Sequence, residues 1–171
     1  MLTALTLIAT SVVTRFGEIS VFAHGDVVRV AGFGSPEHIA ARHEHALEGA
    51  TWQHGELPQL VEALQAWENG DLHALDDVAV AQPGGPFMQR AWQELRDIPA
   101  GEAISYAALA ERAGSPRAAR AAGQACARNA IAPFVPCHRV VPSTGVGNYG
   151  YGPDLKRDIL AHEGVAKDRL R

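Results

Sequence analysis

The chain has 171 residues, 47% of them apolar and 20% charged, which is the composition of a globular protein and excludes an intrinsically disordered chain. Its two cysteines exclude a disulfide framework and favour a reducing compartment such as the cytoplasm. The net charge of −4 divides into −8 (3 − 11) over residues 1–83 and +4 (12 − 8) over residues 84–171. This division indicates that only the second half would meet a polyanion, although solvated charges can also cluster by chance.

The first 33 residues predict strands. The opening apolar run, residues 1–13, has no Lys or Arg before it and is too short to span a bilayer, so we expect a strand and not a signal peptide or a membrane anchor. Valine and phenylalanine recur through residues 11–33, where the turn-forming stretches RFGE and AHGD interrupt them. We therefore expect an antiparallel meander of short strands.

Two helices follow, with a linker between them. Apolar residues recur every three or four positions over residues 57–67, and Asn69-Gly70 ends this pattern. Residues 71–86 are acidic and then rich in glycine and proline, which predicts a linker. The next helix should begin at Pro86, because proline is common at the first helical position.

A helix-turn-helix pattern comes next. Ser105 can cap a first helix over residues 106–113, and Gly114 breaks it. Ser115 can then cap a second helix with Pro116 at its first position. Two short helices around a tight glycine turn are typical of DNA-binding hairpins, but many helix hairpins never touch DNA.

The second of these helices combines small residues with arginines. Alanine and glycine dominate it, Arg117 and Arg120 lie near its start, and Arg128 lies at its end. Small side chains let a helix backbone approach a partner closely, and the arginines can then contact phosphates or enter a groove. A tightly packed internal helix with solvated arginines would have the same composition.

Cys137 and His138 stand side by side in VPCHRVVPS. A thiol attacks only as the thiolate, and the pKa of a free cysteine is about 8.5, so a base or a nearby positive charge must favour the ion. Neighbouring residues on a strand point to opposite faces, so contact between the two side chains requires a turn at Cys137. A histidine base also needs a third group to orient it, for which Glu163 and Asp154 are candidates. An inert core thiol remains an alternative.

A metal site is a weaker interpretation of the same residues. Cys126, Cys137, His138 and His162 could be proposed as ligands, but the chain has no Cys-x-x-Cys or His-x-x-x-His pair. Zinc sites are usually built from such spaced pairs. We therefore expect neither a metal nor a cofactor.

PCHRVV, with ISYAALAERAGSPRAARAAGQACARN before it and GNYGYGPDLKRDILAHEG after it, resembles the O6-alkylguanine-DNA alkyltransferases, also called methylated-DNA–protein-cysteine methyltransferases. The resemblance covers about residues 86–164 and includes several motifs in the family's order and spacing. It implies an α/β (α+β) protein of two domains. Residues 1–80 would form a ribonuclease H-like domain of a small sheet and a helix, and residues 81–171 a mostly helical, winged-helix-like domain with the helix-turn-helix.

The resemblance implies a repair reaction on DNA. The alkyl group of O6-alkylguanine, and of O4-alkylthymine if that base is accepted, would move to Cys137 in a single irreversible turnover. By match, His138 deprotonates Cys137 through a water, Glu163 orients His138, and Asn129 holds the turn that bears the cysteine. This is a relay of the general triad type.

The resemblance also implies that the target nucleotide is flipped out of double-stranded DNA, because a base inside the duplex is out of reach. Arg120 matches the arginine that fills the vacated space, on a helix that enters the minor groove. Tyr106 matches a tyrosine that helps to rotate the phosphate and donates to guanine N3. Ser115, Arg117 and Arg128 are expected to contact the DNA.

A lesion pocket is implied on the other side of the cysteine. The carbonyls of Cys137 and Val140 match acceptors for the exocyclic amine, and Tyr149 and the backbone N–H of Gly150 lie in the loop that donates near O6. Three features depart from the family: Ala130 replaces a common proline, Gly150 replaces the serine of some members, and the N-terminal half has no cysteine for zinc or phosphotriester repair.

Two other functions compete with repair. A lesion-binding relative without catalysis would lack the acceptor cysteine, whereas a transcription regulator would read sequence through dimeric half-sites. The repair protein is expected to act as a cytoplasmic monomer on DNA, with no membrane partner and with cooperative binding left open.

Overall fold

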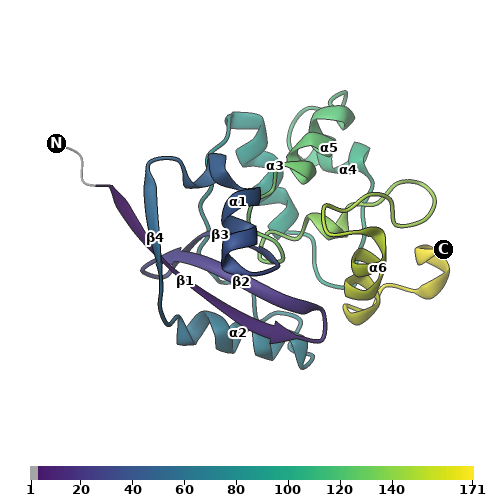
Figure 1. Ribbon diagram of the computed structural model, residues 1–171. Coiled ribbons are helices and arrows are strands. Elements are labelled where there is room, and N and C mark those ends of the chain that lie inside the picture. Colours follow the sequence, from purple (N-terminus) through teal and green to yellow (C-terminus); the bar gives the residue numbers. More distant parts are fainter. Residues whose placement is uncertain (1–3) are drawn as a thin grey trace. The chain divides into compact units, whose positions relative to one another are not determined.

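The computed structural model describes residues 4–171, so the first three residues of the predicted N-terminal strand lie outside the described residues. The chain forms two compact units: one extends to Pro83 and includes Ala130–Phe134, and the other comprises Gly84–Asn129 and Val135–Arg171. The described part contains one four-stranded sheet and six α-helices (Figure 1). The prediction of a mixed α/β fold is therefore confirmed.

The first unit is built on the sheet, whose order is β3-β2-β1-β4. Its first three strands are antiparallel neighbours joined by short turns, as the meander predicted. The fourth strand runs parallel to the first, a pairing that the sequence did not predict. The strands are β1 (Leu5–Thr14), β2 (Gly17–His24), β3 (Val27–Phe33) and β4 (Ala50–His54).

Two helices complete this unit. α2 (Pro58–Glu68) is the predicted helix, and it buries Leu60, Leu64 and Trp67. α1 (Pro36–Arg42) was not predicted; it begins after Ser35, whose side chain accepts a hydrogen bond from the His38 N–H. α1 contacts the first three strands and α2 contacts β1, so both helices shield the apolar residues of the sheet from water.

The second unit is mostly helical. The predicted helices are present as α3 (Pro86–Arg96) and α4 (Tyr106–Arg112), and the Ser105 side chain caps α4 as expected. α3, α4 and α5 (Ala119–Ala127) contact one another, and the indole N–H of Trp92 donates to the Ala125 carbonyl at 2.9 Å. No helix among residues 4–171 is long and apolar enough to cross a bilayer.

The predicted start of the second hairpin helix was wrong. Ser115 does not cap α5, which begins at Ala119 after the cap residue Ala118. The Ser115 carbonyl accepts a hydrogen bond from the Ala118 N–H at 2.9 Å and closes an isolated turn. Arg117 therefore lies in that turn and not in the helix.

Five residues from the second half of the sequence belong to the first unit. The Ala31 N–H of β3 donates to the Ala130 carbonyl at 2.8 Å, and Ala31 forms a parallel bridge with Ile131. The chain thus leaves the second unit after Asn129 and re-enters it at Val135. Cys137 follows two residues later.

Candidate active site

Cys137 opens a short 3-10 turn, η2 (Cys137–Arg139), so the turn that a Cys-His contact requires begins at this residue. Cys137 is only 8% exposed. The side chain of Asn129 is buried and donates to the Val135 carbonyl at 2.7 Å. This bond joins the two residues that flank the segment 130–134. Asn129 thereby fixes the backbone directly before the cysteine.

His138 is held by a buried carboxylate. Its Nε2 lies 2.7 Å from Glu163 Oε1, and Glu163 ends the helix α6 (Pro153–His162) as its C-terminal cap residue. Arg139 donates to both oxygens of the same carboxylate, at 3.0 and 2.7 Å, and to the Ile98 carbonyl at 2.6 Å. Asp154, the other candidate for orienting the histidine, is exposed and pairs with Arg157.

Glu163 is an anion and His138 is neutral in this arrangement. Burial alone would raise the pKa of Glu163, but His138 and the Arg139 guanidinium hold that pKa well below its usual range. Burial lowers the pKa of His138, and the Glu163 carboxylate offsets this only in part. His138 Nε2 must therefore carry the proton that Glu163 accepts, which places the lone pair on Nδ1. Nδ1 is buried and has no hydrogen-bond partner among residues 4–171, so it can accept a proton.

Acid should destabilise the protein through His138. The unfolded chain protonates this histidine near its ordinary pKa of about 6.5, whereas the folded protein keeps it neutral, so unfolding takes up a proton as the pH falls. We expect the free energy of unfolding to fall between about pH 7 and pH 5, and His138→Gln to remove part of this slope. Burial also lowers the pKa of His43 to about 4, so urea titrations must compare the variant with the wild type. Equal slopes in the two proteins would contradict the assignment.

Lys156 is a further charged residue at the site, and it is 1% exposed. Its ammonium donates to the Val140 carbonyl at 2.7 Å and to the Asn148 carbonyl at 3.1 Å. Burial lowers its pKa, which the Cys137 and Cys126 thiols partly offset. The Val140 carbonyl, which we predicted to accept from the guanine amine, thus already accepts one hydrogen bond from Lys156. Its second lone pair remains for a ligand.

The residues predicted to contact DNA are exposed or partly exposed. No hydrogen bond or ion pair occupies the exposed guanidinium groups of Arg117, Arg120 and Arg128 within the described chain. Tyr106 lies at the start of α4, close to Gly123 of α5. Burial, and then the Cys126 and Cys137 thiols, raise the pKa of Tyr106, so its phenol keeps its proton. Tyr106 thus lies beside α5 and within electrostatic reach of both thiols, and the three guanidinium groups are exposed.

Two further predicted residues lie in the loop before α6. Tyr149 is half-buried and packs against Tyr151, with ring centroids 5.5 Å apart. Gly150 is exposed. Lys156 connects this loop to the cysteine turn, because its ammonium donates to Asn148 of the loop and to Val140 at the end of η2.

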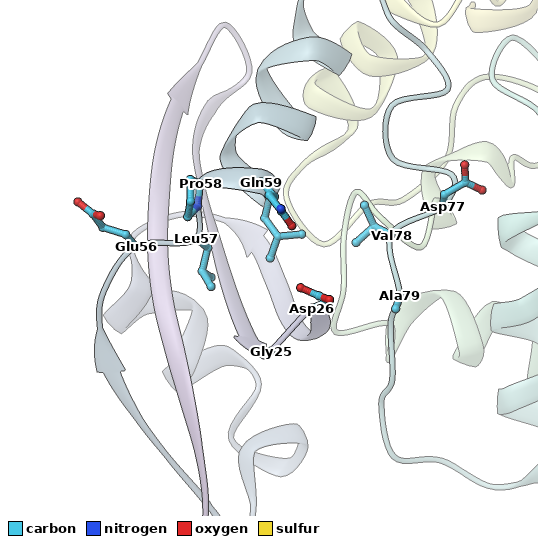
Figure 2. Close-up of a pocket in the computed structure, with 10 residues that line it drawn as sticks. Gly25, Asp26, Glu56, Leu57, Pro58, Gln59, Asp77, Val78 and Ala79 are labelled. Atoms are coloured by element: carbon cyan, nitrogen blue, oxygen red, sulfur yellow. The ribbon is translucent and has the colours of Figure 1, made fainter.

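A separate pocket of about 390 Å³ lies within the first unit (Figure 2). Its charged residues are all acidic, and Figure 2 shows Glu56 pointing away from Asp26 and Asp77. The lining contains no cysteine, histidine or basic residue. Across residues 4–171, no group of His, Cys, Asp and Glu could hold a metal ion.

Arg139 and Lys156 are site residues that the sequence prediction missed. A signal for Lys156 was present, because Lys156, Ile159, Leu160 and Glu163 recur at the spacing of one helix face, and Ile159 and Leu160 mark that face as buried. A lysine on an apolar face needs partners for its ammonium. Arg139 had no comparable signal. All three residues of η2 are buried, so no periodic pattern of apolar and polar residues marks Arg139 as a buried cation.

Comparison with known proteins shows which families the chain resembles. Residues 86–165 match the family model described as 6-O-methylguanine DNA methyltransferase, DNA binding domain. The chain is 40% identical over 119 residues to the constitutive methylated-DNA–protein-cysteine methyltransferase of Bacillus subtilis, which covers 67% of this chain and 72% of that protein. It is 38% identical over 138 residues to the methylated-DNA–protein-cysteine methyltransferase of Mycobacterium leprae, which covers 78% of this chain and 82% of that protein.

A solved structure extends the similarity to nearly the whole chain. A crystal structure of Mycobacterium tuberculosis OGT in complex with DNA is 31% identical and has a TM-score of 0.74, over 94% of this chain and 96% of that chain. The first three curated relatives are matched over 62–72% of their own length. Together these matches define a class of DNA repair proteins that transfer an alkyl group from damaged DNA to a cysteine. The chain belongs to the methylated-DNA–protein-cysteine methyltransferase family, as the sequence motifs predicted.

Proposed function

We propose that this chain repairs O6-alkylguanine in DNA by moving the alkyl group to Cys137. The observation that carries the proposal is the buried His138–Glu163 pair, 2.7 Å apart, directly after a cysteine that opens a turn. Glu163 fixes the histidine with its unprotonated nitrogen at Nδ1, as a proton acceptor requires. The alternative of a lesion-binding protein without catalysis is disfavoured by the presence of this cysteine.

The transfer is a displacement at the alkyl carbon. His138 Nδ1 takes the thiol proton through a water, a sulfur–carbon bond forms, and the carbon–O6 bond breaks with its electron pair returning to the guanine. The leaving base then needs a hydrogen-bond donor, and the Tyr106 phenol, whose pKa burial raises, keeps its proton for guanine N3. The carbonyls of Cys137 and Val140 accept from the exocyclic amine, and Tyr149 and the Gly150 N–H lie near O6.

The product is a thioether, which is not hydrolysed under mild conditions, so each chain acts once. Incubation with duplex DNA carrying a radiolabelled O6-methylguanine, followed by peptide mapping, tests the proposal. We expect one methyl group per chain, on the peptide that contains Cys137. Label on any other peptide, or turnover beyond one equivalent, would sink the proposal.

DNA is engaged in this proposal through the minor groove by α5. Arg120 fills the space of the flipped nucleotide, and Arg117, Arg128 and the turn at Ser115 contact the backbone, since the three guanidinium groups are exposed. The protein is proposed to act as a cytoplasmic monomer. In this view residues 1–80 form a ribonuclease H-like domain that Ala130–Phe134 join, and the rest of residues 81–171 form a winged-helix-like domain.

Arg120→Ala should separate extrusion from chemistry. We expect repair of O6-methylguanine in a duplex to slow by roughly 100-fold, because flipping costs a few kcal/mol that the inserted side chain offsets. Reaction with the free modified base should change by less than about threefold, since nothing has to be extruded. Single-turnover rates on both substrates check this, with the exposed Arg112→Ala of α4 as the matched control. Equal losses on the two substrates would contradict the role.

A further inference from the structure

The glycine-rich loop, residues 142–152, is held by side chains from other segments. None of the backbone N–H groups of residues 142–148 donates to a backbone carbonyl of the described chain, so this stretch has no strand or helix ladder of its own. Gly145 and Gly147 have φ values of 71° and 74°, which only glycine adopts readily. A loop of this kind would be mobile unless other groups fixed it.

Arg169 is the main external tie. It lies in the 3-10 turn η3 (Lys167–Leu170), near the end of the described chain. Its guanidinium donates to the Pro142 carbonyl at 2.9 Å and to the Gly145 carbonyl at 3.4 Å. A cation that bonds two carbonyls of one loop restrains both of them at once.

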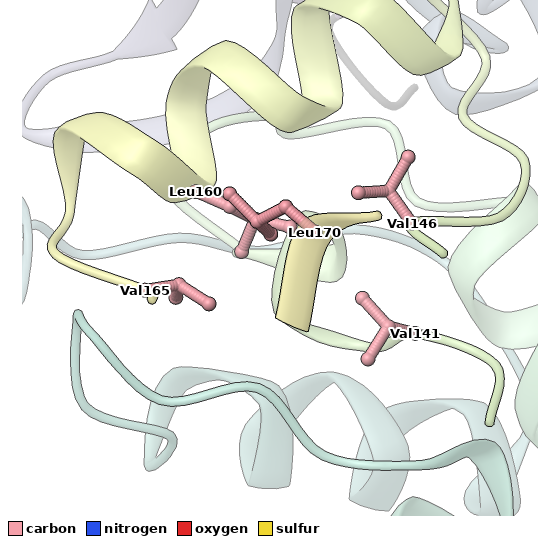
Figure 3. Close-up of a cluster of buried hydrophobic side chains, with 5 residues drawn as sticks. All are labelled: Val141, Val146, Leu160, Val165 and Leu170. Atoms are coloured by element: carbon pink, nitrogen blue, oxygen red, sulfur yellow. The ribbon is translucent and has the colours of Figure 1, made fainter. Parts of the chain in front are cut away.

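Leu170 anchors the turn that carries Arg169. It is 5% exposed and belongs to an apolar cluster with Val146 of the loop and Leu160 of α6. Figure 3 shows Leu160 and Leu170 next to one another. Arg157 of α6 also donates to the Leu170 carbonyl at 3.3 Å. Residues of η3 therefore connect the loop to α6, the helix that supplies Lys156 and Glu163 to the cysteine turn.

We infer that Arg169 is a positioning residue for alkyl transfer, which holds the glycine-rich loop in the conformation that receives the damaged base. The inference rests on the proposed function, because it gives the loop the lesion-pocket role. The side-chain hydrogen bonds of Arg169 go to the loop carbonyls and not to Cys137. Its loss should therefore slow reactions that use the loop and spare the intrinsic reactivity of the thiol.

The test compares two reactions of the same cysteine. In Arg169→Ala we expect transfer from O6-methylguanine DNA to slow about tenfold, the effect of losing roughly one charged hydrogen bond. Alkylation of Cys137 by iodoacetamide should stay within about twofold of the wild type, because this small reagent needs no base-binding loop. Arg169→Lys, which can still bond one carbonyl, should recover part of the transfer rate. Lys167→Ala, an exposed residue of the same turn, is the matched control.

Limited proteolysis supplies a second readout that does not depend on activity. Arg169→Ala should speed cleavage within residues 143–149 and leave the strands of the first unit uncut. Unchanged transfer in Arg169→Ala, or an equal loss of both alkylation reactions, would overturn the inference. If the wild type transferred no alkyl group while Arg169→Ala still loosened the loop, the proposed function would fail and the structural tie would stand.

Discussion

Cys137→Ser is expected to abolish alkyl transfer, with a loss on the order of a thousandfold or more, while Cys126→Ser keeps it. A serine hydroxyl is a weak nucleophile at neutral pH, and His138 alone is not expected to ionise it. Cys126 is the only other cysteine of the chain. Burial, together with the neighbouring Cys137, raises its pKa, so it remains a neutral thiol.

Intact-protein mass spectrometry measures this difference directly. After incubation with excess O6-methylguanine duplex, the wild type and Cys126→Ser should each gain the mass of one methyl group, and Cys137→Ser should gain none. The two cysteines make a matched pair, because both lie in the second unit and neither forms a disulfide. A methyl group on Cys137→Ser, or the absence of one on Cys126→Ser alone, would show that Cys137 is not the acceptor.

Glu163→Ala is expected to lower the free energy of unfolding by about 3–5 kcal/mol, the usual cost of breaking a buried ion pair from one side. The substitution leaves the side chain of Arg139, which is 6% exposed, without its anion, and His138 without its acceptor. Asp154→Ala removes the partner of an exposed pair with Arg157 on the same helix, and should cost less than about 0.5 kcal/mol.

Urea unfolding of the two variants at neutral pH checks the prediction. A double variant, Glu163→Ala with Arg139→Met, should recover part of the loss, because it removes the uncompensated charge. A similar cost for Glu163→Ala and Asp154→Ala would show that the Glu163 carboxylate does not stabilise His138 and Arg139. The same outcome would weaken the assigned protonation of His138, which depends on an ionised Glu163.

Periodicity predicted those elements whose burial follows the local pattern. The meander, α2, α3 and α4 were found from the recurrence of apolar residues and from turn and cap residues. The pairing of β4 with β1 could not be found this way, since it joins residues about 45 positions apart through parallel bonds that have no local signature. Such a pairing is decided by the packing of the whole unit.

Local rules also gave opposite results at two Ser-Pro pairs. Ser35-Pro36 and Ser115-Pro116 share the residues expected at a helix start, yet only Ser35 caps a helix. The preference of serine and proline for these positions amounts to about 1 kcal/mol, which packing can override. At the site, the sequence motif named the cysteine, the histidine and Glu163. Arg139 carried no local signal, and the helical spacing of Lys156 marked only its burial, so the bonding partners of both cations became evident only from the structure.

The return of residues 130–134 to β3 has a consequence for the order in which the protein is made. A ribosome releases the four strands of the first unit well before it releases this segment, and α3, α4 and α5 are synthesised in between. The hydrogen bond between Ala31 and Ala130 can therefore form only after three helices of the other unit have left the exit tunnel. Completion of the first unit during synthesis thus waits until three helices of the second unit have been made.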